Sequence, residues 1–298
     1  MKQIEITVND AGQRLDRFLK KYLAKAPLSV IYKIIRKDIK LNGKRPKEDT
    51  FLNEGDLLSI YLMDEELDRF TEKKKPAKAK KQFSVIYEDE NILVANKPFG
   101  LLTHGDKTEK KNTLTNQVID YLIEKGEYVP RLEKSFTPAP VHRLDRNTTG
   151  LVVFGKNAKA LRSGTDNFKK FYNAICVGKI EKEERLTGYL LKDPKTNKVK
   201  VYKKELPGGK YIETIVRPIM YNNNYSMVEV ELVTGRSHQI RAHLASIGHP
   251  IAGDPKYGRG SGQLLHAAKL EMNGKIIEAP LPKEFKVLAE EIFGGGNQ

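Results

Sequence analysis

A charged segment around residue 70 constrains the fold of this 298-residue chain more than any other feature. Residues 64–68 are mostly acidic, and six of the nine residues 73–81 are lysine. A run of like charges without large apolar side chains cannot bury enough surface to offset the entropy lost on ordering. We therefore predict a flexible linker over 64–82, which either contacts a polyanion or is only a solvated spacer. The predicted domains are a small N-terminal domain (1–63), a larger domain (83–293) and a flexible tail (294–298).

The N-terminal domain is predicted to contain two helices and a small sheet. Leu15, Phe18 and Leu19 recur at helical spacing, whereas residues 58–62 alternate as in a strand. The pair Asn42-Gly43 is typical of a tight hairpin. This domain is therefore expected to be a compact α/β module.

Basic residues are concentrated in one stretch of this domain, residues 33–47. Three of them are spaced i, i+3 and i+4 on the second predicted helix, so they share a face. With a net charge of +15, this pattern favours a polyanionic partner such as nucleic acid or an acidic membrane surface. The simpler alternative is a solvated helix face. The candidate RNA-binding residues are Lys33, Arg36, Lys37, Lys40, Lys44 and Arg45.

The composition excludes several classes of protein. The chain has one cysteine, Cys176, so it forms no intrachain disulfide and no cysteine-built zinc site, which favours a reducing compartment. No run approaches eighteen apolar residues, and the N-terminus lacks the apolar stretch of a secretory signal. We therefore expect a cytoplasmic protein.

Strand-like and helical runs alternate through the larger domain. Apolar strands are predicted at 85–87, 92–95, 151–154, 172–177 and 227–233, and helices at 113–123 and 237–247. We therefore expect a mixed α/β chain of the α+β class, whose larger domain surrounds a largely antiparallel sheet.

A loop leading into the strand at 151–154 places Asp145 between Arg143 and Arg146. Neighbouring cations favour the ionised form of a carboxyl group, and an ionised carboxylate can act as a nucleophile or stabilise a cation. On spacing alone, a surface turn in which Asp145 pairs with either arginine is the simpler explanation.

A second segment, 234–243, places Arg241 on a predicted helix that Ser237 caps and Gly248 ends. Arg241 and His238 are three residues apart and share a face beside the helix N-terminus. They are either functional groups or the polar side of an ordinary amphipathic helix. No metal site is expected, because His238 and His243 do not share a helix face.

Two groups of motifs resemble known families. The N-terminal domain resembles the S-four-like RNA-binding domain in Arg14-Leu15-Asp16-Arg17-Phe18-Leu19 and Leu41-Asn42-Gly43-Lys44-Arg45. In the larger domain, His142-Arg143-Leu144-Asp145 followed by Thr148-Thr149-Gly150-Leu151 resembles the signature of the RluA-type RNA pseudouridine synthases. Further matches to that family lie, in its order, at 87–89, 96–104, 170–174, 235–241, 248–254 and 265–267.

The second resemblance implies an isomerase that converts uridine in RNA to pseudouridine without a cofactor or metal. Asp145 is then the catalytic carboxylate, acting on the ribose or on the base, and Arg241 is its ionic partner. Tyr172 is implied to pack on the target base and to assist proton transfer; a core aromatic is the alternative. Because a stacked base is unreachable, the nucleotide must flip out. Arg143 is implied to fill the vacated stack, unless it only forms a salt bridge.

The combination of domains is most similar to family members that act on large-subunit ribosomal RNA. Transfer RNA is an alternative substrate, since sequence discriminates poorly between RNA targets. A non-catalytic RNA-binding or ribosome-assembly protein is a further alternative, although it would not need Asp145, Tyr172 and Arg241 together. We expect a monomer.

Overall fold

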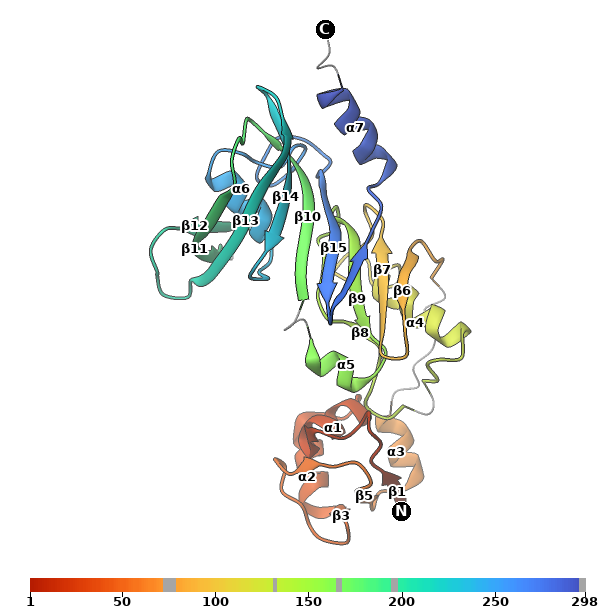
Figure 1. Cartoon of the computed structure of the whole chain (residues 1–298). Coiled ribbons are helices and arrows are strands. Elements are labelled where there is room, and N and C mark those ends of the chain that lie inside the picture. The colour runs from red at the N-terminus through yellow and green to blue at the C-terminus, as the bar shows by residue number, and fades with distance from the viewer. Residues whose placement is uncertain (72–78, 131–132, 165–167, 194–197, 295–298) are drawn as a thin grey trace.

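The chain folds into a small N-terminal domain and a larger domain built on one long sheet (Figure 1). The structure is a computed structural model that describes residues 1–71, 79–130, 133–164, 168–193 and 198–294. The predicted mixed α/β fold with a largely antiparallel sheet is confirmed. No helix in these ranges is long and apolar enough to cross a bilayer.

The N-terminal domain has its own apolar core, which includes the fully buried Phe18 and Leu19. Its three-stranded antiparallel sheet has the order β1-β5-β3, and β2 and β4 form a separate two-stranded pair. The elements are β1 (Lys2–Glu5), β2 (Gln13–Arg14), α1 (Leu15–Tyr22), α2 (Leu28–Lys37), β3 (Ile39–Leu41), β4 (Phe51–Leu52), β5 (Leu57–Ile60) and α3 (Asp64–Phe70).

Helix α3 occupies the segment where a flexible linker was predicted to begin. Leu67 is 3% exposed and lies in the core of the N-terminal domain, with Phe70 packed against it. Three acidic side chains in the first turn of α3 favour its start, because the helix dipole is positive there. The predicted linker is therefore wrong over 64–70. It is also wrong over 79–82, because the backbone N–H groups of Ala79 and Gln82 donate to Asp120 and Gln117 at 3.0 and 2.8 Å. The part at 72–78 and the tail at 295–298 lie outside the described residues.

The larger domain contains an eleven-stranded sheet. Its main path is β12-β11-β13-β14-β10-β15-β9-β7-β6, and β15 pairs in parallel with β9 while the other pairs are antiparallel. All five predicted strands are confirmed. The strands are β6 (Ser84–Glu88), β7 (Ile92–Lys97), β8 (Ala139–Pro140), β9 (Thr149–Gly155), β10 (Phe168–Val177), β11 (Glu184–Lys192), β12 (Val199–Tyr202), β13 (Lys210–Tyr221), β14 (Tyr225–Leu232), β15 (Leu265–Met272) and β16 (Lys275–Glu278).

The helices of this domain are α4 (Leu114–Glu124), α5 (Ala158–Ser163), α6 (Gln239–Ser246) and α7 (Lys283–Phe293). The expected cap of α6 at Ser237 is wrong. The cap position is His238, whose φ of 58° is left-handed, and its side chain makes no capping bond. Instead, the Gln239 side-chain oxygen accepts a hydrogen bond from the Arg236 backbone N–H at 3.1 Å.

Candidate active site

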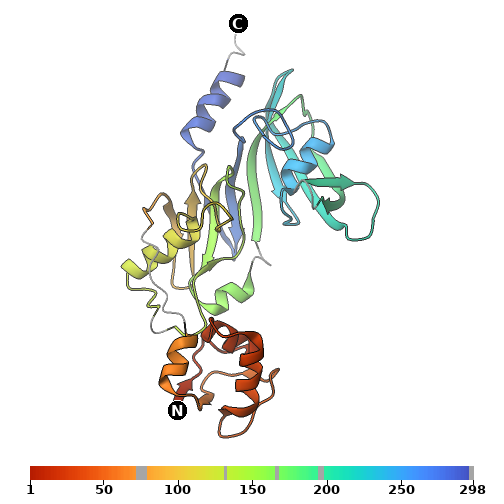
Figure 2. The same ribbon diagram turned by 180° about the vertical axis from the view of Figure 1, so that it is seen from behind.

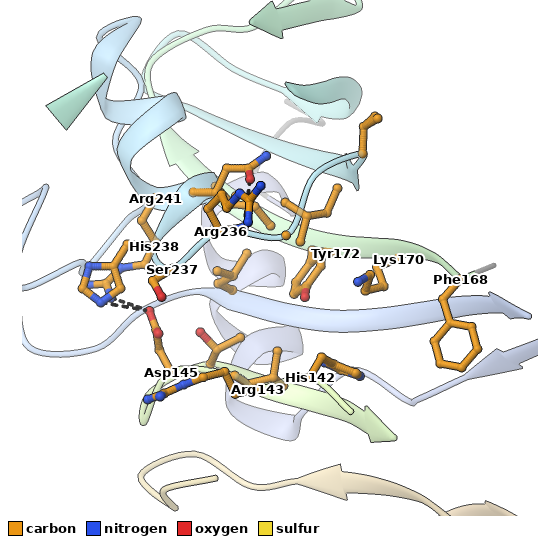
Figure 3. A pocket seen from close by; sticks show the side chains of 18 of the residues that line it. His142, Arg143, Asp145, Phe168, Lys170, Tyr172, Arg236, Ser237, His238 and Arg241 are labelled. Atoms are coloured by element: carbon orange, nitrogen blue, oxygen red, sulfur yellow. Dashed lines mark hydrogen bonds and ion pairs between the residues drawn. The ribbon is translucent and has the colours of Figure 1, made fainter. Parts of the chain in front are cut away.

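A pocket of about 530 Å³ lies between the loop before β9, strand β10 and the start of α6 (Figure 3). The four residues predicted for catalysis and base flipping all line it: Arg143, Asp145, Tyr172 and Arg241. Lys170 and Arg236 also line it. Asp145 is the one acidic side chain among the described residues of this lining. Its volume suits a nucleotide-sized ligand, and its cations suit an anionic one.

The structure joins Asp145 to Arg241 across 96 residues of sequence. The Asp145 Oδ2 atom accepts a hydrogen bond from Arg241 Nη1 at 2.6 Å. Arg241 is buried, while the Asp145 side chain retains 27% exposure. The alternative of a local surface turn is wrong, because Arg146 pairs with Asp106 at 3.2 Å. The carboxylate therefore has a fixed cation on one side and solvent access on the other.

A second carboxylate holds the opposite edge of the same guanidinium group. Arg241 Nε and Nη2 donate to the two oxygens of Asp254 at 2.7 and 2.8 Å, and Asp254 is fully buried. Burial lowers the pKa of Arg241, but its bonds to Asp254 and the charge of Asp145 outweigh this and raise it. The ring of Tyr257 lies 5.2 Å from the guanidinium carbon. Sequence reasoning gave Asp254 no role; its place in a family motif was the available signal.

The Asp145 loop is tied down by a buried lysine that the sequence analysis also overlooked. Lys97 Nζ donates to the backbone carbonyls of Pro98, Leu101 and Arg146 at 3.0, 2.7 and 2.9 Å. Burial lowers the pKa of Lys97 to about 7, although the negative charge of Asp145 opposes this. An ammonium group has three N–H donors, so each of the three carbonyls can accept one hydrogen bond. Because one of these carbonyls belongs to Arg146, Lys97 fixes the residue that follows Asp145.

The end of the loop depends on a glycine. Gly150 has φ of +105°, and a Cβ atom there would lie 2.2 Å from the carbonyl oxygen of Ala267 on β15. A larger residue is therefore excluded at this parallel contact. Beside it, the Thr149 hydroxyl and His266 Nδ1 are 2.8 Å apart, a buried contact that joins β9 to β15.

Tyr172 is a core aromatic residue that also lines the pocket. Its ring lies in the main apolar core and is 5% exposed. Its hydroxyl group faces the pocket (Figure 3) and has no hydrogen-bond partner in the described part of the chain. Burial and then the charge of Asp145 raise the pKa of Tyr172, so its hydroxyl is protonated at neutral pH.

His238 is a further polar group near the carboxylate. Its Nε2 atom is 3.8 Å from Asp145 Oδ2, and its Nδ1 atom is 3.0 Å from the Tyr257 hydroxyl. Burial lowers the pKa of His238 more than Asp145 raises it, which favours the neutral ring. No cluster suited to a metal ion occurs among the described residues.

The six predicted RNA-binding residues lie on the N-terminal domain and not in the pocket. All six are exposed, and within the described ranges none of them forms an ion pair. They are Lys33, Arg36 and Lys37 on α2, Lys40 on β3, and Lys44 and Arg45 after it.

Comparisons with known proteins identify the family of this chain. The sequence profile of the family described as RNA pseudouridylate synthase matches residues 91–246. Ribosomal large subunit pseudouridine synthase C of Vibrio parahaemolyticus is 32% identical over 95% of this chain and 93% of its own length. The protein of the same name in Escherichia coli is 32% identical over 96% of this chain and 95% of its own.

A solved structure shares the fold. Human RNA Pseudouridylate Synthase Domain Containing 4 superposes with a TM-score of 0.57 and 20% identity, covering 70% of this chain and 92% of its own. The family profile matches more than half of the chain, and relatives that are 32% identical align over nearly all of it, so the chain belongs to the RNA pseudouridylate synthase family of isomerases.

Proposed function

We propose that this RNA pseudouridine synthase acts on uridines of large-subunit ribosomal RNA, with Asp145 as its catalytic carboxylate. The buried Arg241 that binds Asp145 at 2.6 Å inside a cationic pocket is the observation that carries the assignment. Relatives named for the large ribosomal subunit, which align over nearly the whole chain, support this RNA target.

The role of Asp145 follows from its partner. A guanidinium group is always charged, so Arg241 orients an ionised carboxylate toward the pocket. That carboxylate attacks either the ribose or the base, the glycosidic bond between ribose and nitrogen breaks, and the ribose rejoins the uracil at carbon five. The bond between Asp145 and the substrate then breaks, which regenerates the carboxylate. Carbon five then loses a proton, and the freed nitrogen gains one.

Tyr172 is placed to serve these proton transfers. Its ring offers a flat surface for the uracil, and its protonated hydroxyl can donate a hydrogen bond to the base. When Asp145 forms its bond to the substrate, its negative charge is lost. One of the two causes that raise the pKa of Tyr172 then disappears, which eases proton exchange at that hydroxyl.

Arg143 and the N-terminal domain provide RNA contacts in this proposal. Arg143 is exposed two residues before Asp145, where its planar guanidinium can fill the stack left by a flipped nucleotide. The N-terminal domain is an S-four-like module whose six exposed cations bind phosphates. We further propose that the protein acts in the cytoplasm as a monomer.

The RNA target is tested with purified enzyme and unmodified transcripts of large-subunit ribosomal RNA and of transfer RNA. We expect pseudouridine, mapped by carbodiimide labelling and primer extension, at specific positions of the ribosomal transcript. Modification confined to transfer RNA, or absent from both, would contradict the proposed target.

A further inference from the structure

A second pocket, also about 530 Å³, lies between the two domains. One wall is formed by β2, α1 and β4 of the N-terminal domain, and the other by residues 135–137 and α5 of the larger domain. Figures 1 and 2 show α5 placed between the long sheet and α1. We call this pocket the interdomain crevice.

Cations from both domains converge on this crevice. Arg14, the cap position of α1, is followed within the helix by Arg17 at i+3 and Lys21 at i+7, and Arg162 of α5 also lines the crevice. Arg14 pairs with Asp16, but Arg17 forms no ion pair with any described residue. The described lining contains no aspartate or glutamate. A cleft lined by charges of one sign concentrates its field and attracts counter-ions.

The cations also repel each other across the crevice. Burial and then the charge of Arg162 lower the pKa of Lys21, against a smaller opposing effect of Asp10. Lys21 Nζ donates to the neutral Gln13 side chain at 3.0 Å, and Arg162 Nη1 donates to the Ala11 carbonyl at 2.8 Å. An anion bound here would relieve this repulsion.

The crevice is held open by a buried polar interface. Asp10, which is 1% exposed, accepts a hydrogen bond from the Ser135 hydroxyl at 2.7 Å. The backbone N–H of Ala158, at the start of α5, donates to the Asn9 side chain at 3.1 Å. The Asp10 carboxylate is therefore engaged across the interface, and these hydrogen bonds join the two walls of the crevice.

Helix α5 also borders a pocket that adjoins the active site. A third pocket of about 220 Å³ lies on another side of α5, where Lys159 and Ser163 line it. Its lining residues Val141 and Phe168 also line the active-site pocket. Helix α5 thus lies between this third pocket and the crevice, so an RNA that leaves the active site through the third pocket would have to pass α5 to reach the crevice.

We infer that the interdomain crevice binds the phosphate backbone of the substrate RNA at a distance from the target uridine, so that both domains contact the same RNA. This inference rests on the proposed function and adds a binding surface that α2 does not provide. Phe51, which is 63% exposed at the crevice, offers a ring on which a base can stack, and this favours RNA over a free inorganic anion.

The test compares a variant that lacks two cations of the crevice with a control variant that lacks two cations elsewhere on the same domain. The crevice variant is Arg17→Gln with Lys21→Gln, and the control is Lys25→Gln with Arg69→Gln. The control residues are exposed, belong to the same domain and do not line the crevice. The dissociation constant for an unmodified ribosomal RNA fragment is measured between about 50 and 300 mM KCl, and a melting curve is recorded for every protein. Because both variants lose the same net charge, the comparison separates binding at the crevice from a general effect of charge.

We expect the crevice variant to bind about tenfold more weakly near 0.1 M salt, with a log–log salt slope shallower by about 1.4–1.8, because two phosphates are no longer neutralised. The control should change by less than about twofold. Equal losses of affinity in both variants would overturn the inference. Pseudouridine mapping with the wild-type enzyme tests the proposed function independently of this binding experiment. If the double variant has a lower melting temperature than the wild type, the single variants Lys21→Gln and Lys25→Gln are compared instead. The expected change in salt slope is then half as large, because one phosphate contact is lost.

Discussion

The charged groups of the active site and those of the N-terminal domain are held in opposite ways. In the active site, Arg241 lies between two carboxylates and Lys97 meets three carbonyls. On α2, Lys33, Arg36 and Lys37 are exposed without ion pairs in the described structure. Charges held in one position suit a reaction that requires accurately placed groups. Exposed, unpaired cations suit binding to the phosphates of RNA, which does not depend on base sequence. Substitutions should therefore affect turnover in the first region and salt-dependent affinity in the second.

The largest effect is expected for Arg241→Met, which should abolish turnover and also destabilise the fold. Because the substitution leaves Asp254 buried without its cation, we expect a loss of about 3–5 kcal/mol in the free energy of unfolding. Urea denaturation and single-turnover assays measure the two effects. Adding Asp254→Asn should restore much of the stability but no activity. Restored turnover in that double variant would show that Arg241 acts only through folding.

Tyr172→Phe should reduce turnover by about two to four orders of magnitude. The ring keeps its place in the core, and the hydroxyl has no partner to lose among the described residues, so the melting temperature should stay near that of the wild type. RNA affinity should change little, which filter binding can check. A drop in melting temperature that parallels the loss of activity would favour a purely structural role.

Lys97→Met should lower turnover by a smaller factor and destabilise the protein by about 1–3 kcal/mol, because buried carbonyls lose their donor. The stability of the wild type relative to this variant should rise with pH from about 7 toward the pKa of a free lysine. In that window the unfolded chain still binds a proton that folded Lys97 has released. Denaturation between about pH 6 and 9 measures the trend, with Lys107→Met as the exposed control. A flat difference would contradict the buried assignment.

Replacing Lys33, Arg36 and Lys37 with glutamine should have the smallest effect on chemistry. Single-turnover rates at saturating RNA should match the wild type, while the salt slope of binding should become shallower by about 0.7–0.9 for each phosphate that is no longer neutralised. An unchanged slope would mean that the α2 surface does not touch the RNA backbone.

Secondary structure was predictable where one physical signal dominated. The apolar run at 151–154 lies in the fully buried strand β9, and Thr113 caps α4 by accepting a bond from the Asn116 backbone. Strand β13 gave no such signal, since it contains Pro218, which is unfavourable inside a sheet. The structure accommodates it with a register shift between Pro218 and Met220.

The site was predictable only in part. Motifs brought Asp145, Tyr172 and Arg241 together correctly, because each lies in a segment that resembles the family. The roles of Lys97 and Asp254 were not predicted, although both lie in segments that resemble the family, because Lys97 bonds to backbone carbonyls and Asp254 reaches Arg241 from a loop. In that loop, a Cβ atom on Gly253 (φ +74°) would lie 2.0 Å from a neighbouring carbonyl. Such arrangements depend on three-dimensional packing and leave no periodic pattern.

Asp145→Asn tests the central claim most directly. The change keeps the shape of the side chain and removes its charge, while Arg241 retains Asp254, so the fold should survive. The control is Asp106→Asn, an exposed carboxylate paired with Arg146, which should leave activity intact. We predict normal melting, near-normal RNA binding and no detectable pseudouridine from purified Asp145→Asn on its RNA. Appreciable pseudouridine formation by that variant would contradict the assignment of Asp145 as the catalytic carboxylate.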